Sequence, residues 1–402
     1  MSHSVKWYSS AMQGAPLLSS GSGGAAHTVP QGSLIALLKA ILVTGFGVQA
    51  LGSAVYDSQA ATITLTLSSG HAYLKDSIIE VSGANEAGFN GEFRVQSTTT
   101  NTVVVGLENG TPGAAAATGD LAIKIPGLGW EVLFEDAANY KIIFGRTDEN
   151  ATPIKLMVDN SAWTNWNAYS GHLAKVAMVE DVTDINTYTT VYEHRWPCSH
   201  NYAVPEWQAV GDSLLLYFMP AYGMGGTSNY KTRALFAFGD INSVRPGDQY
   251  HCLLISYSQT SNTNYWNNTA TSIYNDALLF SNANYKTMAR SHHQLPGAVS
   301  ALWRGLSGAF GEGMSFPNPA DNGFYVSTEP VPVHDNLSYR GSLPGVVVPY
   351  ASPIAFDKTH LNNLPGLPDK LIRLLLCNNQ TAAGSGTDYR RLIGFDIKGP
   401  WR

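Results

Sequence analysis

The sequence has few charged residues. Asp, Glu, Lys and Arg make up 13% of its 402 residues, about half the usual share of roughly 25%. The formal net charge is −6, and no basic run is longer than the pair Arg390-Arg391. A nucleic-acid-binding protein needs clustered cations to neutralise phosphates. We therefore expect no nucleic-acid partner, and a neutral polar surface that offers little electrostatic resistance to self-association.

Cysteines and long apolar runs are also scarce. The three cysteines, Cys198, Cys252 and Cys377, are odd in number and far apart, so they predict no disulfide framework and fit synthesis in a reducing cytosol. The longest apolar run, 34–44, contains a lysine and is much shorter than the roughly 20 residues that cross a bilayer. The first residues contain no apolar stretch after a basic one, so we expect neither a membrane span nor a cleaved signal.

Strand patterns dominate the sequence, and its 44% of apolar residues is enough to fold around a core. Between residues 51 and 126, five short β-type segments are separated by Gly- and Asn-rich turns, which is typical of a small antiparallel barrel or sandwich. From 127 to 402, further apolar segments alternate with long polar and aromatic loops. The continuous apolar run Ser213–Phe218 predicts a central strand that is covered on both faces.

One helix is expected over Leu34–Val43, with Ser33 as its N-cap and Gly45 at its end. Apolar residues cover most of its circumference, so it should be buried on several sides. We predict a mainly β fold: an antiparallel β-sandwich or barrel body, this N-terminal helix and an inserted small β-barrel-like domain. The expected domains are an N-terminal arm with a docking helix (1–50), the inserted domain (51–126) and the main β domain (127–402), which packs with 1–50.

One group of residues has the chemistry of a zinc site. His194, Cys198 and His200 follow the spacing H-x3-C-x-H, and His251 or Cys252 would complete a tetrahedron of imidazole and thiolate ligands. The paired knuckles of most zinc sites are missing, so we favour ordinary packing and loop hydrogen bonds. We predict no metal and no cofactor.

Two further groups of residues contain side chains that could bind a metal. Glu180, Asp181, Asp184 and Asn186 offer oxygen ligands for calcium, but the spacing and the final Glu of an EF-hand are absent. Asx turns that close a loop after a strand are the favoured interpretation. The pair His292-His293 is a weaker metal candidate of the same imidazole type as the group around His194.

Asp240 and Asp248 are the best candidates for acid–base catalysis. Two carboxylates in one cleft could act as the acid and base of a glycosidase. The favoured interpretation is structural: Asp240 caps a turn, Arg245 pairs with one of the two carboxylates, and Pro246-Gly247 forms a tight turn. Because no nucleophile motif is present either, we predict a protein that is not an enzyme.

Aromatic residues lie among Asn and Ser in two loops, where rings and amides can bind either a glycan or a partner protein. We favour a protein interface. The six candidate contact residues are Trp163, Trp166, Tyr169, Tyr265, Trp266 and Tyr274.

A series of short motifs spans nearly the whole chain. They are Val5-Lys-Trp7, Met12-x-Gly-Ala-Pro16, Gly32-Ser-Leu-Ile-Ala-Leu-Leu-Lys39, Gly45-Phe-Gly47, Gly129-Trp130 with Phe134, Asp181-x-x-Asp-Ile-Asn186, Trp207 with Gly211-Asp212, Phe238-Gly-Asp240, Arg245-Pro-Gly-Asp248, Arg340-Gly-x-Leu-Pro-Gly345 and Gly399-Pro-Trp-Arg402. In content and order they resemble a family of tailed-bacteriophage virion proteins that are described as structural or tail proteins. The stretch 51–126 resembles the small β modules of phage fibre and baseplate proteins.

The resemblance implies a structural component of a tailed-phage virion, in the tail or baseplate region, and it implies no catalytic residues. The expected partners are other virion structural proteins and further copies of this chain, after synthesis in the bacterial host cytoplasm. The expected docking helix would contact a neighbouring virion protein through Leu34, Leu37, Leu38 and Ile41. Two alternatives stay open: a tail protein that binds a host receptor or surface glycan, and a capsid or neck decoration protein.

Overall fold

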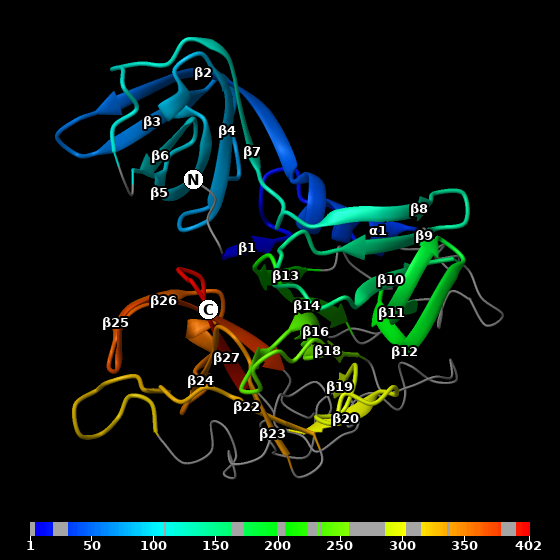
Figure 1. The fold of residues 1–402 in the computed structure, drawn as a ribbon. Coiled ribbons are helices and arrows are strands. Elements are labelled where there is room, and N and C mark those ends of the chain that lie inside the picture. Colours follow the sequence, from blue (N-terminus) through cyan, green and yellow to red (C-terminus); the bar gives the residue numbers. More distant parts are fainter. Residues whose placement is uncertain are drawn as a thin grey trace.

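A computed structural model describes residues 5–18, 31–107, 110–161, 173–198, 206–223, 231–233, 235–256, 286–302, 315–335, 338–378 and 391–402. Strands hold 52% of the described residues and helices 6%, which confirms the mainly β prediction. The strands form a closed six-stranded barrel, a five-stranded sheet and a large 16-stranded sheet. Figure 1 shows the barrel, in blue to cyan, at one end of the molecule.

The barrel is an antiparallel sheet that closes on itself in the order β2-β3-β6-β5-β4-β7. Its strands are β2 (Phe46–Asp57), β3 (Thr62–Leu67), β4 (Ile78–Ala84), β5 (Gly91–Thr98), β6 (Thr102–Gly106) and β7 (Gly119–Ile125), with the short 3₁₀ helix η2 (Ala87–Phe89) before β5. The five strands expected from the sequence are present. The sixth, β2, begins inside the stretch that was assigned to the N-terminal arm.

The five-stranded sheet is a meander in the order β12-β11-β10-β9-β8. Its strands are β8 (Glu131–Asp136), β9 (Lys141–Gly145), β10 (Lys155–Asp159), β11 (Leu173–Asp184) and β12 (Thr187–Pro197). Alternate residues of these strands point to opposite faces. Ile142 and Val158 therefore join the main core, while Ile143 and Met157 belong to a separate small cluster on the other face.

The large sheet is antiparallel throughout and carries the rest of the chain. Its strands are β1 (Lys6–Ser9), β13 (Trp207–Gly211), β14 (Leu215–Gly223), β15 (Lys231–Arg233), β16 (Phe236–Asp240), β17 (Asn242–Ser243), β18 (Cys252–Ile255), β19 (Lys286–Met288), β20 (Val299–Leu302), β21 (Val326–Ser327), β22 (Pro332–Asp335), β23 (Ser338–Ser342), β24 (Val346–Pro349), β25 (His360–Leu364), β26 (Leu367–Asn378) and β27 (Arg391–Asp396), and the 3₁₀ helix η3 (Ile354–Phe356) precedes β25. The run that predicted a central strand is β14, which pairs with β13 and β16 and is buried from Leu215 to Met219.

The expected helix is α1 (Ser33–Lys39), which continues into a π-helical turn, η1 (Ala40–Thr44). Ser33 is not its N-cap: the cap position is Gly32, and the Ser33 hydroxyl instead donates to the carbonyl of Cys198 at 2.7 Å. Asn160 Oδ1 accepts from the Leu34 N–H at 3.1 Å and so satisfies one of the free donors at the helix start. The helix ends at Gly45, as predicted, with a φ of 71°.

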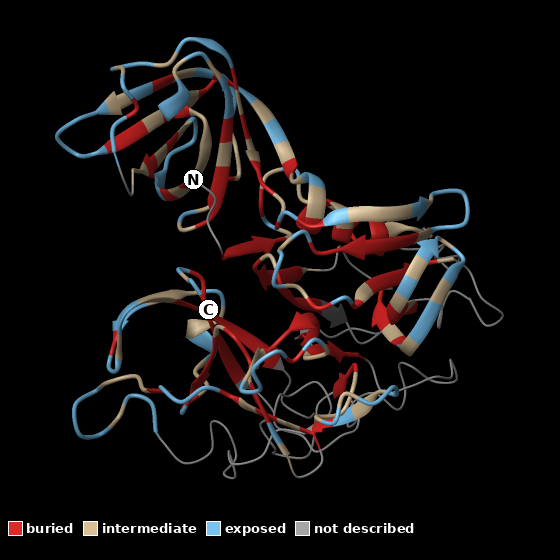
Figure 2. Cartoon of the chain, in the orientation of Figure 1, coloured by how far each residue is buried: buried red, intermediate tan, exposed pale blue. Residues whose placement is uncertain are grey.

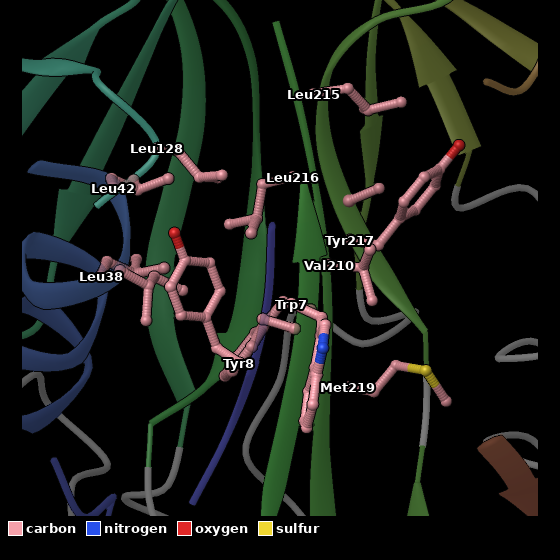
Figure 3. Packing of buried hydrophobic residues seen from close by; sticks show 14 of the residues in the cluster. Trp7, Tyr8, Leu38, Leu42, Leu128, Val210, Leu215, Leu216, Tyr217 and Met219 are labelled. Atoms are coloured by element: carbon pink, nitrogen blue, oxygen red, sulfur yellow. The ribbon is translucent and has the colours of Figure 1, made fainter. Parts of the chain in front are cut away.

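The helix is part of the main core rather than a surface element. Figure 3 shows Leu38 and Leu42 of the helix beside Tyr8 of β1 and Leu128. The four residues predicted to dock onto a neighbour, Leu34, Leu37, Leu38 and Ile41, are fully buried in this chain. The prediction of a docking face is corrected accordingly, because the chain's own strands already cover these side chains.

Burial follows the layers of the fold. Figure 2 shows buried residues along the central strands, and exposed residues on the outer hairpins and on the barrel loops. No helix in the described ranges is long and apolar enough to cross a bilayer.

Candidate functional site

The sequence motifs that are far apart along the chain contact one another in the interior. Gly47 has a φ of 70°, and a Cβ on it would lie 2.1 Å from the carbonyl oxygen of Gln13, so only glycine allows the two motifs to meet here. The indole of Trp207 donates to the carbonyl of Pro16 at 2.8 Å. The motifs around 12–16, 45–47 and 207 thus form one packed unit.

A second set of motifs meets around Asp212. The indole N–H of Trp130 donates to the Asp212 carbonyl at 3.2 Å, and its ring packs edge-on against Phe238 at 5.9 Å. Arg402 Nη2 lies 3.2 Å from both carboxylate oxygens of Asp212. Burial raises the pKa of the Asp212 carboxyl, and the Arg402 charge opposes that rise. The last residue of the chain is therefore tied to the strand turn between β13 and β14.

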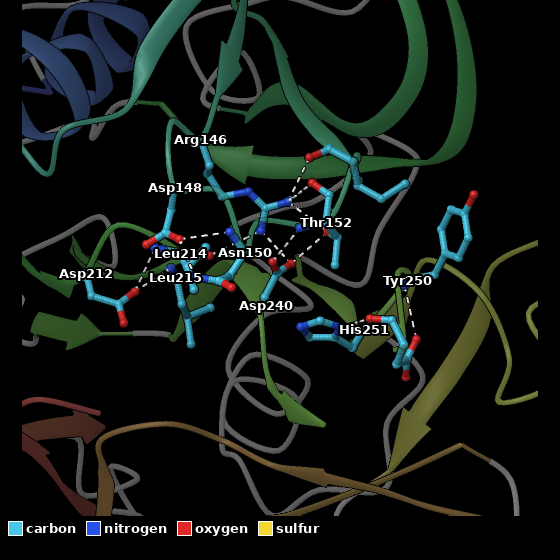
Figure 4. Close-up of polar contacts among 12 residues, drawn as sticks. Arg146, Asp148, Asn150, Thr152, Asp212, Leu214, Leu215, Asp240, Tyr250 and His251 are labelled. Carbon is cyan, nitrogen blue, oxygen red and sulfur yellow. Dashed lines mark hydrogen bonds and ion pairs between the residues drawn. The ribbon is translucent and has the colours of Figure 1, made fainter. Parts of the chain in front are cut away.

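Asp240, a catalytic candidate, is enclosed in a buried ion pair. Its carboxylate accepts from Arg146 Nη1 at 2.5 Å and from the backbone N–H and the hydroxyl of Thr152, both at 2.8 Å (Figure 4). The side chains of Arg146 and Asp240 are almost completely buried, with 1% and 0% of their surface exposed. The expected ion pair between Arg245 and Asp240 is wrong. Arg146, which directly follows β9, pairs with Asp240 instead.

Asp248, the second candidate, is also fully engaged. Its carboxylate accepts from Arg340 Nη2 at 2.6 Å, from Gln294 Nε2 at 2.9 Å and from the Tyr250 N–H at 3.1 Å. Burial alone would raise the pKa of Asp248, but these three donors hold it below its ordinary value. An ionised, charge-paired carboxylate is a poor general acid. Each of the two candidate carboxylates contacts a buried arginine from a distant part of the chain.

The loop between these carboxylates has the predicted tight turn. The Asp248 N–H donates to the carbonyl of Arg245 at 3.3 Å, and Gly247 has a φ of 70°, as a type II turn requires. The Arg245 side chain donates to the carbonyl of His292, so it pairs with neither carboxylate.

The candidate metal ligands have other partners where the structure describes them. His292 Nδ1 lies 3.0 Å from Asp335 Oδ1, and its ring is 3.8 Å from that of His293. Asp184 Oδ1 accepts from the Asn186 N–H at 2.7 Å, which confirms the predicted Asx turn. Glu180 accepts from Arg290 at 3.0 and 2.8 Å. Within the described ranges, no three His, Cys, Asp or Glu side chains are grouped as metal ligands.

The candidate zinc ligands are described only in part, because His200 lies outside the described residues. His194 is buried in β12 and stacks on Tyr192 with 5.7 Å between ring centroids. Burial lowers the pKa of His194 to about 4 and raises the pKa of the Cys198 thiol to about 12. At neutral pH the imidazole is therefore uncharged and the thiol protonated. Of the two optional ligands, Cys252 is buried and His251 Nδ1 lies 2.5 Å from the Asp248 carbonyl.

The aromatic contact candidates Trp163, Trp166, Tyr169, Tyr265, Trp266 and Tyr274 all lie outside the described residues.

The structure also contains a site that the sequence did not reveal. A cavity of about 550 Å³ lies where the barrel meets β1, β25 and β26; we call it the junction cavity. Its volume falls in the range of small-molecule sites, roughly 300–1,000 Å³. The residues that line it are Trp7, Ser9, Ala11, Leu74, Lys75, Asp76, Lys358, His360, Asn362, Leu371 and Arg373.

A chain of hydrogen bonds crosses one wall of the junction cavity. His360 Nδ1 lies 2.7 Å from Asp76 Oδ2, and His360 Nε2 lies 2.6 Å from Arg373 Nη1. Because a guanidinium only donates hydrogen bonds, Nε2 must be the acceptor and the proton must be on Nδ1. Burial lowers the pKa of His360, in agreement with this neutral tautomer. The residues lie up to 284 positions apart in sequence, so no local pattern could predict the cluster.

The sequence and the fold were compared with those of known proteins. No family model and no curated protein matches the chain. The solved structure of the phage phi92 endosialidase aligns with 88% of this chain and 71% of its own, at 13% identity and a TM-score of 0.18. A TM-score of this size does not establish a common fold, so the alignment carries no argument about function.

Proposed function

We propose that the protein is a non-enzymatic structural subunit of a tailed-phage virion, in the tail or baseplate region. The observation that carries the proposal is the contact network among the motifs of the family resemblance. Gly47, Trp130, Trp207, Asp248 and Arg402 all hold distant segments of the interior together. Motifs with such roles preserve a shape, which is what an assembly subunit needs.

Assembly through β-rich surfaces is supported by the open edges of the five-stranded sheet. Among the described strands, β8 and β12 each have a single neighbour. An edge strand presents free N–H and C=O groups to which a strand of another chain can be added. The first half of β12, Thr187–Val191, is largely exposed and has no charged side chain. We propose that other virion proteins or further copies of this chain pair here.

The proposal is tested by quantifying this chain in purified particles. Virions of the phage that carries the sequence are banded by density and digested, and their peptides are counted by mass spectrometry against the major tail and capsid proteins. A structural subunit gives a fixed number of copies per particle that survives a high-salt wash. Loss of the chain from washed particles contradicts the structural role.

A further inference from the structure

One of the four buried arginines in the described ranges differs from the other three in the groups that it binds. The four are Arg146, Arg233, Arg340 and Arg373. Three of them bind carboxylates at 2.5–2.8 Å: Arg146 binds Asp240, Arg233 binds Glu206 and Asp357, and Arg340 binds Asp248 and Asp335. Arg373 instead donates to His360 Nε2 at 2.6 Å and to Gln208 Oε1 at 2.7 Å. Both of these acceptors are uncharged.

A buried charge without a partner of opposite sign is costly, and little offsets that cost at Arg373. The Trp7 ring supports the guanidinium, with 3.9 Å from Cζ to the ring centroid. The nearby Asp76 carboxylate accepts a hydrogen bond from the neutral His360 instead, and Glu206 pairs with Arg233 and Lys358. Burial and the Arg233 charge lower the pKa of Arg373 to about 9, so the group stays cationic at neutral pH and is short of anionic contacts.

Arg373 lines the junction cavity together with two exposed lysines, Lys75 and Lys358. The cavity thus has a buried cation in its wall and two cations at its solvent side, against one carboxylate, Asp76. Among the described residues, only His360 and Gln208 accept from Arg373, so two of its five N–H donors are used there. A planar oxyanion can use the others, because guanidinium groups match carboxylates and phosphates geometrically.

We propose that the junction cavity binds the oxyanion group of a small acidic molecule, a carboxylate or a phosphate monoester, with Arg373 as the buried ligand and Lys75 and Lys358 at the rim. Leu74, Lys75 and Asp76 belong to the barrel, whereas Lys358, His360 and Arg373 belong to the large sheet and its loops. A ligand held between them stabilises the contact of the barrel with the body. This inference is independent of the virion role.

The binding test uses three hexoses that differ at one position: glucose, glucuronate and glucose 6-phosphate. Calorimetric titration of the full chain at low ionic strength should give binding for the two acidic sugars and none for glucose. Binding should also raise Tm with ligand concentration and weaken with added salt. Tighter binding of glucuronate identifies a carboxylate site, and tighter binding of glucose 6-phosphate identifies a phosphate site. Equal behaviour of all three sugars overturns the proposal.

Variants locate the binding in the junction cavity. Lys75→Glu reverses an exposed rim charge and should weaken acidic-sugar binding at least about fivefold, with no change in the unfolding curve without ligand. Lys175→Glu, an equal charge change on β11 outside the cavity, is the matched control. Arg373→Lys keeps the charge but removes the fork and should weaken binding at least about tenfold. Wild-type affinity in a folded Lys75→Glu protein overturns the proposal even if Arg373→Lys does not fold.

Discussion

Arg340 donates a hydrogen bond from Nη2 to Asp248 at 2.6 Å, and both side chains are almost completely excluded from solvent. The other end of the same guanidinium, Nη1, donates to Asp335 at 2.8 Å. One cation therefore bridges two buried carboxylates, one from β22 and one from the loop before β18. The motifs that contain Arg340 and Asp248 are joined by this contact.

Replacement of Arg340 by methionine should lower the free energy of unfolding by about 3–5 kcal/mol, because it leaves two buried carboxylates without their cation. Urea unfolding followed by tryptophan fluorescence measures the change. Arg245→Met is the control, since Arg245 is exposed and binds a backbone carbonyl, and it should cost less than about 1 kcal/mol. Similar stabilities of the two variants would contradict a structural role for the buried pair.

The contact between Gly345 and Trp401 joins two of the sequence motifs, and it leads to a second prediction. Gly345 has a φ of 69°, and a Cβ on it would lie 2.2 Å from the Trp401 ring. Gly345→Ala should lower the free energy of unfolding by about 2–4 kcal/mol, through backbone strain and the clash together. Gly247→Ala separates the two effects: its φ is 70° but no atom lies within 4 Å of the added methyl group, so strain alone should cost about 1 kcal/mol. If Gly345→Ala lowered the free energy of unfolding by less than Gly247→Ala does, a clash with the Trp401 ring would be excluded.

His194 should make stability depend on pH. Its pKa is about 4 in the folded chain and about 6.5 when unfolded, so the unfolded state binds more protons between these values. Stability is then complete above about pH 6.5 and falls as the pH drops toward 4, by up to about 3 kcal/mol. His194→Gln should remove that part of the loss when urea unfolding at pH 7 and pH 4.5 is compared. An equal loss in both proteins would assign the pH dependence to other groups.

Excision of the barrel tests whether it is an insertion. Phe46 and Ile125 are register partners of β2 and β7, so a two-residue Asn-Gly turn can replace residues 47–124. We expect the remaining chain to unfold cooperatively and to enter particles. Its Tm should be lower, because the contacts of Trp7 and His360 with Asp76 and of Gln13 with Gly47 are lost. A shortened chain that folds but is absent from particles would contradict a peripheral barrel. A chain that does not fold would show that the barrel is part of the body.

The strands of the barrel show what local patterns can predict. β3 to β7 were located because their apolar residues alternate and turn residues separate them. β2 was missed because Gly47 and Gly52 interrupt the alternation, and because the strand shifts register at Phe46–Gln49 and at Leu51–Ser53. A bent strand that pairs on both sides to close a barrel leaves no simple period in its sequence.

Contacts across long sequence distances could not be predicted. The turn at Pro246-Gly247 was correct because it depends on two adjacent residues. The partners of the carboxylates were wrong because Arg146 lies 94 residues before Asp240 and Arg340 lies 92 after Asp248. The N-cap assignment to Ser33 was wrong for the same reason. The Leu34 N–H donates to Asn160 Oδ1, which lies 126 residues away in the sequence.

The most direct test of the proposed virion role is cryo-electron microscopy of intact particles of a tailed phage whose genome encodes this sequence. We predict repeated density in the tail or baseplate that fits the large sheet, the five-stranded sheet and the barrel, with neighbouring chains along β8 or β12. Particles with a complete tail and baseplate in which no density fits these sheets would contradict the proposed role.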